Sequence, residues 1–283
     1  MIYDSYRKLL QFLTVVKQSK KPLRFLIAQV LAKTGLCKFF VIKMDGYKLI
    51  FNPTALSITL FSNAGDRDHD EDFLKKILKE GDTYVDIGAN IGTLVLCASQ
   101  LVGSKGKVVA IEAHPRTFGY LSQNVALNGF TNIKLLNYAV GDKDGMLSFS
   151  DSNTDDQNKV IGSNGSGIII PVKKLDALLK QERHITLLKI DVEGFEKFVV
   201  GGATEMLKRT DVVLFESWDQ HFLNYGYTVG ELIDLFEDTG FKVFNIKNDK
   251  LYNISRLYNS VKCENLLAIR NMAQFSSKTA IKL

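Results

Sequence analysis

The sequence of 283 residues lacks the features that mark secreted, membrane-spanning or zinc-binding proteins. It has only three cysteines, and this odd, widely spaced set argues against both a disulfide framework and a zinc site. No apolar run reaches the roughly 18 residues of a transmembrane helix, and the first residues lack a signal-peptide pattern. We therefore expect a cytoplasmic protein whose cysteines are core thiols.

Proline is also scarce, and no internal repeat or low-complexity tract is found. With 46% apolar residues, a chain of this length can bury a large core. From residue 83 onward, strand-like and helix-like stretches alternate, which predicts an α/β fold with a mostly parallel, doubly wound sheet. Two last strands, at 242–247 and 265–269, are expected to pair antiparallel. We expect this domain to span 72–270, between an N-terminal extension at 1–71 and a polar, frayed tail at 271–283.

The N-terminal extension is basic, whereas the rest of the chain is not. Residues 1–50 contain ten Lys or Arg and two acids, which leaves a net charge of −3 on the remainder. Two basic helices are predicted around Pro22, followed by a hairpin that turns at Asp45-Gly46 and a further strand at 56–60. The helices are interpreted in two ways: they rest on an anionic membrane or gather an acidic substrate, or they are a solvated pair that covers the sheet edge or caps the active site.

The sequence TYVDIGANIG at 83–92 has the pattern of a strand, a glycine turn and a helix N-terminus. Gly88 and Gly92 allow positive φ and a close approach of the backbone to a ligand. The spacing differs from the three-glycine dinucleotide fingerprint, because Asn90 takes the middle position and Asp86 would repel a pyrophosphate. A ligand with a cationic amino group, such as S-adenosylmethionine, fits this turn better.

The ends of the next two strands supply further candidates for this cofactor site. Glu112 ends the strand at 107–112 and lies 20 residues beyond Gly92, the separation at which an acid binds ribose hydroxyls. The segment at 137–141 ends the third strand, where an adenine would reach. Asp142 is interpreted either as a polar contact to that adenine or as a turn residue. Residues 143–174 interrupt the alternation and are predicted to form a hairpin insertion, a candidate lid.

A second informative stretch, LLKIDVEGFE at 187–196, places two acids at the end of a buried strand. Asp191 and Glu193 are expected to point into one pocket at the edge of the sheet where ligands bind. The alternative is that they favour a helix N-terminus. Glu216 follows another strand at 211–215, and Lys189 is expected to orient the substrate or to hold an acid.

Taken together, these segments resemble the FkbM-type S-adenosylmethionine-dependent methyltransferases from about residue 72 to 269. The matching segments are VDIGANIG at 85–92, IEAHP at 111–115, NxxLNG at 124–129, AVGDKDG at 139–145, LDALL at 175–179 and LLKIDVEGFE at 187–196. The resemblance implies a class I methyltransferase fold of Rossmann-like topology and O-methylation of a hydroxyl, often on a sugar. Many members have a histidine two residues after the acid at 216, and here that place is Trp218.

The resemblance and the residues together define an expected site. The cofactor is expected to contact Asp86, Gly88, Ala89, Asn90, Gly92, Glu112, Ala113, Val140, Asp142 and Asp191. The proton acceptor is expected to be Glu193 or Asp191, with Glu216 or His221 in reserve. No metal is expected, although Mg²⁺ on Asp191 and Glu216 is an alternative.

The expected acceptor is a hydroxyl-bearing small molecule or a glycan, not a nucleic acid. Two other functions stay open at this point. One is a non-catalytic cofactor-binding subunit of a glycan-building assembly, and the other is a nicotinamide-dependent oxidoreductase, which the glycine spacing opposes.

Overall fold

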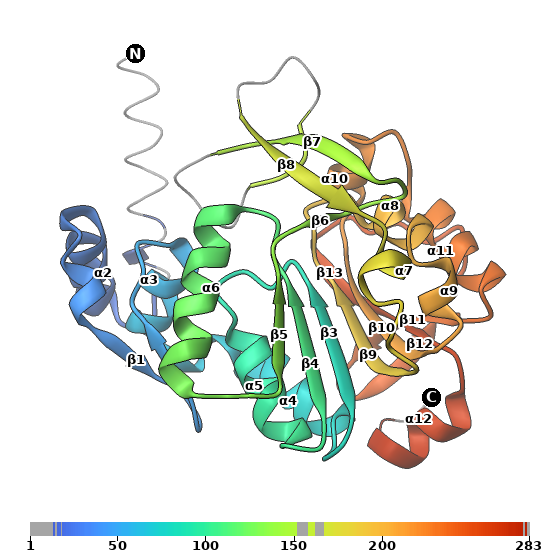
Figure 1. Cartoon of the computed structure of the whole chain (residues 1–283), viewed down its shortest axis with the longest axis horizontal. Helices are drawn as coiled ribbons and strands as arrows, with labels where there is room; N and C mark the ends of the chain where they lie inside the picture. Colours follow the sequence, from blue (N-terminus) through green and yellow to red (C-terminus); the bar gives the residue numbers. More distant parts are fainter. Residues whose placement is uncertain are drawn as a thin grey trace.

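The computed structural model describes residues 14, 16–17, 19–151, 158–161, 167–279 and 281. Its centre is an eight-stranded sheet with the order β12-β11-β13-β10-β9-β3-β4-β5 (Figure 1). Four neighbouring pairs are parallel and join β10 (Thr210–Ser217), β9 (Ile185–Ile190), β3 (Thr83–Ile87), β4 (Lys107–Ile111) and β5 (Ile133–Leu136). The antiparallel side contains β13 (Glu264–Ile269), β11 (Lys242–Lys247) and β12 (Lys250–Asn253). The predicted mostly parallel sheet with an antiparallel end is confirmed, and β12 is an addition to it.

The central strands are apolar on both faces because helices cover both. Tyr84 and Val85 are adjacent on β3, yet they belong to two different core clusters. The cluster that contains Tyr84 is closed by α4 (Asp68–Ile77), α5 (Thr93–Val102), α6 (Pro115–Asn128) and α12 (Met272–Thr279). The cluster that contains Val85 is closed by α7 (Leu175–Leu178), α8 (Glu196–Gly201), α9 (Thr204–Leu207) and α11 (Val229–Asp238). The result is a three-layer arrangement with the sheet in the middle.

The N-terminal elements pack beside α6 rather than on the sheet. They are α2 (Pro22–Thr34), η1 (Leu36–Phe39), the hairpin β1 (Val41–Lys43) and β2 (Lys48–Ile50), α3 (Ala55–Ser62) and η2 (Ala64–Arg67). The side chains of Asn124 and Asn128 on α6 accept hydrogen bonds from the backbone N–H groups of β2, both at 2.8 Å. The predicted hairpin is confirmed, and it is fastened to α6. The first of the two predicted helices lies mostly outside the described residues.

Two expectations about secondary structure were wrong. The expected strand at 56–60 is part of α3, because Thr54 caps a helix there and its Oγ1 accepts a hydrogen bond from the Ser57 N–H at 3.0 Å. The expected frayed tail contains α12, which buries Phe275 against the core and places Lys278 Nζ 2.7 Å from Asp82.

The insertion after β5 forms a small sheet of its own. It contains β6 (Ala139–Val140), β7 (Gly145–Phe149) and β8 (Ile168–Lys173), in the order β6-β8-β7. In Figure 1 this sheet lies above the ends of the central strands. Much of the connection between β7 and β8 lies outside the described residues, so the movement of a lid stays a prediction.

Among the helices in the described part of the chain, none has the length and apolar character needed to cross a membrane.

Candidate functional site

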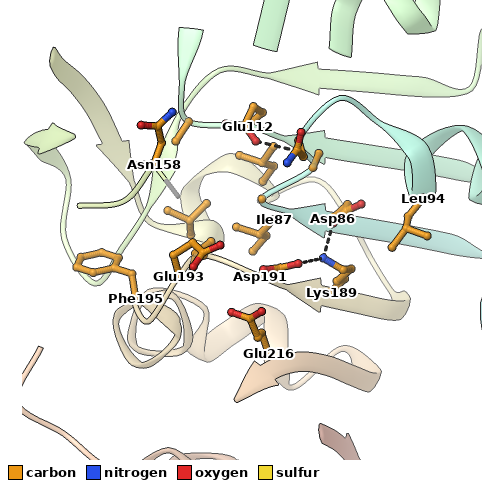
Figure 2. Close-up of a pocket in the computed structure, with 18 of the residues that line it drawn as sticks. Asp86, Ile87, Leu94, Glu112, Asn158, Lys189, Asp191, Glu193, Phe195 and Glu216 are labelled. Atoms are coloured by element: carbon orange, nitrogen blue, oxygen red, sulfur yellow. Dashed lines mark hydrogen bonds and ion pairs between the residues drawn. The ribbon is translucent and has the colours of Figure 1, made fainter. Parts of the chain in front are cut away.

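A cavity of about 340 Å³ opens at the carboxyl ends of β3, β4, β9 and β10. This is the edge at which open α/β sheets bind ligands. Figure 2 shows that the labelled acids converge on this cavity from separate strands. Among the described residues that line it, Lys189 is the basic one, whereas the acidic ones are Asp70, Asp86, Glu112, Asp191, Glu193, Glu216 and Glu264. The cavity is therefore strongly acidic.

The glycine turn and the second acidic stretch meet where β3 and β9 end. The two strands pair in parallel, with Ile87 opposite Ile190, and the Asp191 N–H donates to the Ile87 carbonyl at 3.0 Å. Gly88 has φ of 84°, and a Cβ on it would stand 1.8 Å from the Asp191 carbonyl oxygen. No side chain fits at this position, so the absence of a Cβ at Gly88 is what lets the two turns come together.

Glu112, at the end of β4, holds the glycine turn from the other side. Its Oε2 accepts the Asn90 N–H and its Oε1 accepts the His114 N–H, each at 2.9 Å. Asn90 itself has φ of 49°, and its side chain accepts the Ile91 N–H at 2.7 Å. A carboxylate oxygen can accept a second hydrogen bond, so Glu112 can hold the turn and still bind hydroxyl groups.

Lys189 lies between two of the predicted acids. Its Nζ is 2.7 Å from Asp191 Oδ2 and 3.8 Å from Asp86 Oδ1 (Figure 2). Lys189 and Asp86 are both buried, so this cation offsets negative charge that would otherwise be costly inside the protein. The expectation that Lys189 holds an acid is confirmed. One carboxylate oxygen of Asp191 is therefore engaged in an ion pair with the ammonium group of Lys189.

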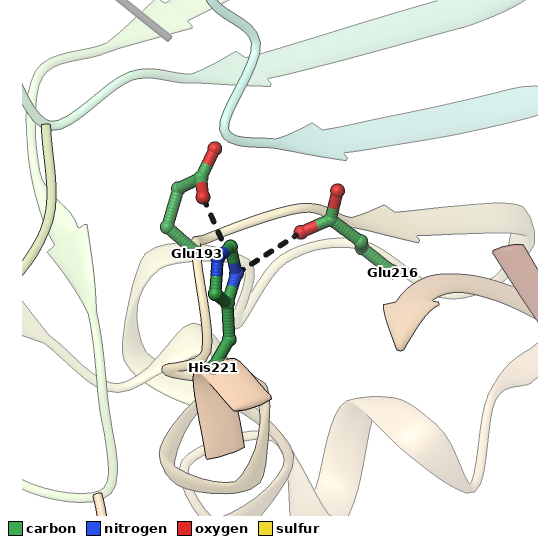
Figure 3. Close-up of side chains that lie close together, drawn as sticks. All are labelled: Glu193, Glu216 and His221. Carbon is green, nitrogen blue, oxygen red and sulfur yellow. Dashed lines mark ion pairs between the residues drawn. The ribbon is translucent and has the colours of Figure 1, made fainter. Parts of the chain in front are cut away.

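Glu193, Glu216 and His221 form a compact cluster at the cavity's edge (Figure 3). His221 Nδ1 is 3.4 Å from Glu193 Oε2 and 3.9 Å from Glu216 Oε2. Burial, and then the charge of Lys159, lower the pKa of His221, so its imidazole is neutral at neutral pH. The ligand atoms of the three residues lie within 4.8 Å of one another, so this set, rather than Asp191 with Glu216, is the one suited to a divalent cation.

A buried carboxyl group supports the turn that carries Glu193. Glu196 is fully buried, and its Oε1 accepts the Val192 N–H at 3.0 Å. The Tyr227 hydroxyl donates to the Gly194 carbonyl at 2.7 Å and lies 3.5 Å from the second oxygen of Glu196. Burial raises the pKa of Glu196 to about 8. Glu193 has φ of 57°, a conformation that needs such support in a residue with a side chain.

Most of the predicted site residues lie together at the cavity. Asp86, Gly88, Ala89, Asn90, Glu112, Ala113, Val140, Asp191, Glu193 and Glu216 all line it. The positions of Gly92 and Asp142 differ from the expectation. Gly92 lies behind the turn, where a Cβ would meet the Leu121 side chain, and Asp142 is exposed and outside the cavity lining.

Several other residues that line the cavity have no recognisable sequence pattern. Asn158 and Val160 come from the insertion, and the Tyr225 hydroxyl donates to the Val160 carbonyl at 2.8 Å. Cys263 lies directly before β13 and is exposed, so the expectation that all three cysteines are core thiols was wrong for it; its thiol donates to Glu216 Oε1 at 2.9 Å. Burial raises the pKa of this thiol, which remains protonated. Contacts of this kind depend on tertiary packing and have no local sequence pattern.

Comparison with known proteins identifies the family. The model of the methyltransferase FkbM domain matches residues 86–243, more than half of the chain. The chain belongs to the FkbM methyltransferase family. It is thus an S-adenosylmethionine-dependent methyltransferase of class I fold, as its sequence motifs and strand order predicted. Membership of this family argues against the nicotinamide-dependent alternative.

Two groups of proteins resemble this FkbM-family chain. The hexuronic acid methyltransferase AglP of Haloferax volcanii is 29% identical over 210 residues, which cover 72% of this chain and 83% of that protein. Among solved structures, a precorrin-6Y C5,15-methyltransferase from Geobacter metallireducens has a TM-score of 0.43 at 15% identity, over 70% of this chain and 85% of that chain. Fibrillarin from Aeropyrum pernix with bound S-adenosyl-L-methionine has a TM-score of 0.42 at 14% identity, and the match covers 71% of this chain and 74% of that chain.

The residues at the cavity fit the family's cofactor. The turn at Gly88 presents backbone close to the cavity, and α5 begins directly behind it with its unpaired N–H groups. Glu112 supplies a carboxylate at the end of the neighbouring strand. Negative charge along the lining suits a ligand that carries an ammonium and a sulfonium.

Proposed function

We propose that this FkbM-family protein transfers a methyl group from S-adenosylmethionine to a hydroxyl oxygen of a sugar, and that its acceptor is a glycan containing a uronic acid. The observation that carries the proposal is the cluster of Glu193, Glu216 and His221 beside the cofactor motifs. The printed name of the relative AglP, a hexuronic acid methyltransferase, supports the acceptor class.

On the cofactor side, the chain supplies hydrogen-bonding groups around a closely fitted turn. Bound S-adenosylmethionine supplies an electrophilic methyl group on a positively charged sulfur. We assign Glu112 to the ribose hydroxyls and the turn at Gly88–Asn90 to the polar tail. Asp86 acts together with Lys189, because the two side chains lie 3.8 Å apart. Ala113 and Val140 are part of the apolar lining of the cavity.

On the acceptor side, the chain has to remove a proton. A sugar hydroxyl has a pKa far above neutral, so a base within hydrogen-bond reach assists its attack. We assign this role to Glu193. The neutral imidazole of His221, whose Nδ1 lies 3.4 Å from Glu193 Oε2, then accepts the proton from Glu193. Asp191 has a different role, because Lys189 holds it at 2.7 Å and stabilises its charge. It positions the acceptor or the cofactor.

The charge of the cavity favours a hydroxyl over a carboxylate as the methylated group. A uronic acid carries both, and either oxygen can receive a methyl group. The acidic lining repels a carboxylate placed among Glu193, Glu216 and Asp191, whereas a neutral hydroxyl is accepted there. Lys159 lies near enough to influence the pKa of His221, and we assign it to the acceptor's own carboxylate.

The proposal is tested with labelled methyl donor and matched oligosaccharides. One contains a uronic acid and the other contains the corresponding neutral hexose. We expect label to enter the uronic-acid oligosaccharide and to resist mild alkali, because a methyl ether survives conditions that hydrolyse a methyl ester. Label that alkali releases would show carboxylate methylation and contradict the hydroxyl assignment.

The same assay separates the enzyme from a non-catalytic cofactor-binding subunit. Such a subunit would bind S-adenosylhomocysteine and label neither oligosaccharide. Replacement of Lys159 by Gln serves as the test of acceptor class, since it should raise KM for the uronic-acid oligosaccharide and leave kcat unchanged. An equal KM in both proteins would contradict the role of Lys159.

A further inference from the structure

The helix α2 is apolar on the face that points to solvent. Its buried side consists of Phe25 and Ala28, which pack toward the core. The opposite side contains four large apolar side chains whose exposed fractions are substantial, Leu23 at 73%, Leu26 at 38%, Ile27 at 48% and Val30 at 60%. Their spacing places them on one face of the helix. A helix with apolar side chains on two opposite faces normally has a partner on both.

The apolar surface continues beyond the end of α2. Leu36 and Phe39 in η1 are 50% and 73% exposed, and Phe40 and Val41 follow them at 42% and 47%. More than half of the large hydrophobic residues that are exposed in the described chain thus fall between residues 23 and 41. The others are scattered from Leu127 to Val261. A concentration of this kind marks an interaction surface.

Positive charge surrounds this surface. Residues 14–44 contain no Asp or Glu. Their basic side chains are all exposed and are Lys17, Lys20, Lys21, Arg24, Lys33, Lys38 and Lys43. Lys20 and Lys21 directly precede α2, Lys33 lies in its last turn, and Lys38 Nζ is 5.3 Å from the ring centroid of Phe39. The partner that matches this pattern is apolar inside and negatively charged at its surface.

We propose that this N-terminal face, made of α2, η1 and the lysines around them, binds the surface of an anionic lipid bilayer. With 13 residues, α2 is too short to cross a bilayer, so it lies in the plane of the surface. Its apolar side chains enter the boundary between head groups and acyl chains, while the lysines reach lipid phosphates. A second copy of the chain is a poorer partner, because two basic faces repel each other.

The position of α2 connects this surface to the catalytic cavity. In Figure 1, α2 lies at the left margin of the molecule, outside α3. The two helices pack against each other, and Leu56 of α3 lines the cavity. A protein held by α2 therefore keeps its cavity close to the bilayer. The lipid-binding inference does not rest on the proposed acceptor and is tested without any methyl transfer.

The test is co-sedimentation of the full chain with vesicles of phosphatidylcholine, either alone or with phosphatidylglycerol. We expect binding to the vesicles that contain phosphatidylglycerol and loss of binding as salt is raised. A variant with Lys20→Glu, Lys21→Glu and Lys33→Glu should lose binding, roughly fivefold for each lysine removed. Arg24 is kept, because its guanidinium packs over the Phe61 ring. A second variant, Ile27→Glu with Val30→Glu, should lose binding with its charges intact.

Matched controls separate a surface effect from a change in fold. Lys180→Glu, Lys242→Glu and Lys247→Glu make the same charge change elsewhere, and Leu257→Glu alters an apolar residue that is 83% exposed. These variants should bind vesicles as the parent does. S-adenosylhomocysteine affinity and thermal denaturation should be the same in all of them.

Three results would overturn the inference. One is vesicle binding that survives both N-terminal variants. Another is the absence of binding to any vesicle. The third is a dimer that Ile27→Glu with Val30→Glu separates, which would show that a second copy covers this face.

Discussion

Gly88 and the carbonyl oxygen of Asp191 lie so close that a Cβ on Gly88 would stand 1.8 Å from that oxygen. The contact joins the turn after β3 to the turn after β9. The residues that we assign to the cofactor and those that we assign to the acceptor are therefore held relative to each other by a backbone contact.

Replacing Gly88 by Ala should disrupt both turns. The side chain would overlap Asp191 backbone and would also force a residue with a Cβ into φ of 84°. We expect a lower melting temperature, because the two turns would have to move apart. Binding of S-adenosylhomocysteine, measured by calorimetry, should weaken at least about tenfold, which corresponds to about 1.4 kcal/mol. Gly81→Ala is the matched control, because Gly81 has φ of 89° with nothing within 4 Å of an added Cβ. Equal losses in the two variants would show that φ strain alone is responsible.

Replacing Glu112 by Ala should weaken cofactor binding by about 1–3 kcal/mol, the usual cost of losing hydrogen bonds to a charged group. The Asn90 and His114 N–H groups would lose their acceptor as well. Calorimetry with S-adenosylhomocysteine measures the effect. Glu182→Ala is a control, since that carboxylate pairs with Lys107 at the start of β4, away from the cavity. Unchanged affinity in Glu112→Ala would contradict the ribose assignment.

Replacing Glu193 by Gln should lower kcat by about 10²- to 10⁴-fold, the usual contribution of a general base. Cofactor affinity should survive, because the amide keeps the shape of the side chain. Asp191→Asn should instead alter binding, because it removes the partner of Lys189 at 2.7 Å. Single-turnover rates and calorimetry separate the two effects. If both variants methylate the acceptor at the parental rate, the carboxylate mechanism is wrong.

The single-turnover rate of methyl transfer by the parent protein should be unaffected by a chelator. We assign proton removal to Glu193 with His221, so no divalent cation is required, although their cluster with Glu216 could hold one. Loss of turnover in EDTA, restored by Mg²⁺ or Mn²⁺, would show that the cluster works through a metal.

Glu196 should make the free energy of unfolding fall as pH rises. Burial raises the folded-state pKa of this carboxyl to about 8, whereas the ordinary pKa of a glutamate, as in the unfolded chain, is 4.5. Between these two pKa values the folded state binds a proton that the unfolded state does not. The contribution of protonated Glu196 to the free energy of unfolding is therefore fully present below the unfolded pKa, and it is lost as pH rises through the folded pKa. Urea unfolding at pH 5 and pH 9 measures this loss. Glu196→Gln still accepts the Val192 N–H and should show a smaller difference, and an identical difference would contradict the assignment.

The central sheet was predictable because its strands are short, continuous apolar runs that end in an acid or a glycine. The strand predicted at 242–247 has the bounds of β11, and the strand predicted at 107–112 agrees with β4 to within one residue. Residues 56–60 were harder, because apolar and hydroxyl side chains alternate there as in a strand, and the decisive signal was the cap at Thr54. The expectation that Asp191 and Glu193 share one pocket agrees with the lining, although Glu193 is not on a continued strand, since its φ is 57°.

The position of His221 could not be predicted from the sequence. It comes from α10 (Asp219–Leu223), a short helix whose placement depends on contacts distant in the chain. Asp219 accepts hydrogen bonds from the backbone N–H groups of Val229 at 3.0 Å and Ser260 at 2.7 Å. Asp142 shows the reverse case. From its sequence position it was either a contact to the adenine or a turn residue, and in the structure it is exposed and outside the cavity lining.

The ring of Trp218 lies 4.3 Å from the ring of His221, centroid to centroid, and Trp218 is the single tryptophan of the chain. Tryptophan fluorescence therefore reports on one location, the surroundings of His221, without any added label. A protonated imidazole quenches indole emission more strongly than a neutral one. The emission intensity of Trp218 should therefore fall as His221 becomes protonated. An unlabelled sugar that binds beside Trp218 and His221 should also change this emission intensity. Candidate acceptors can therefore be screened by the fluorescence of the protein itself.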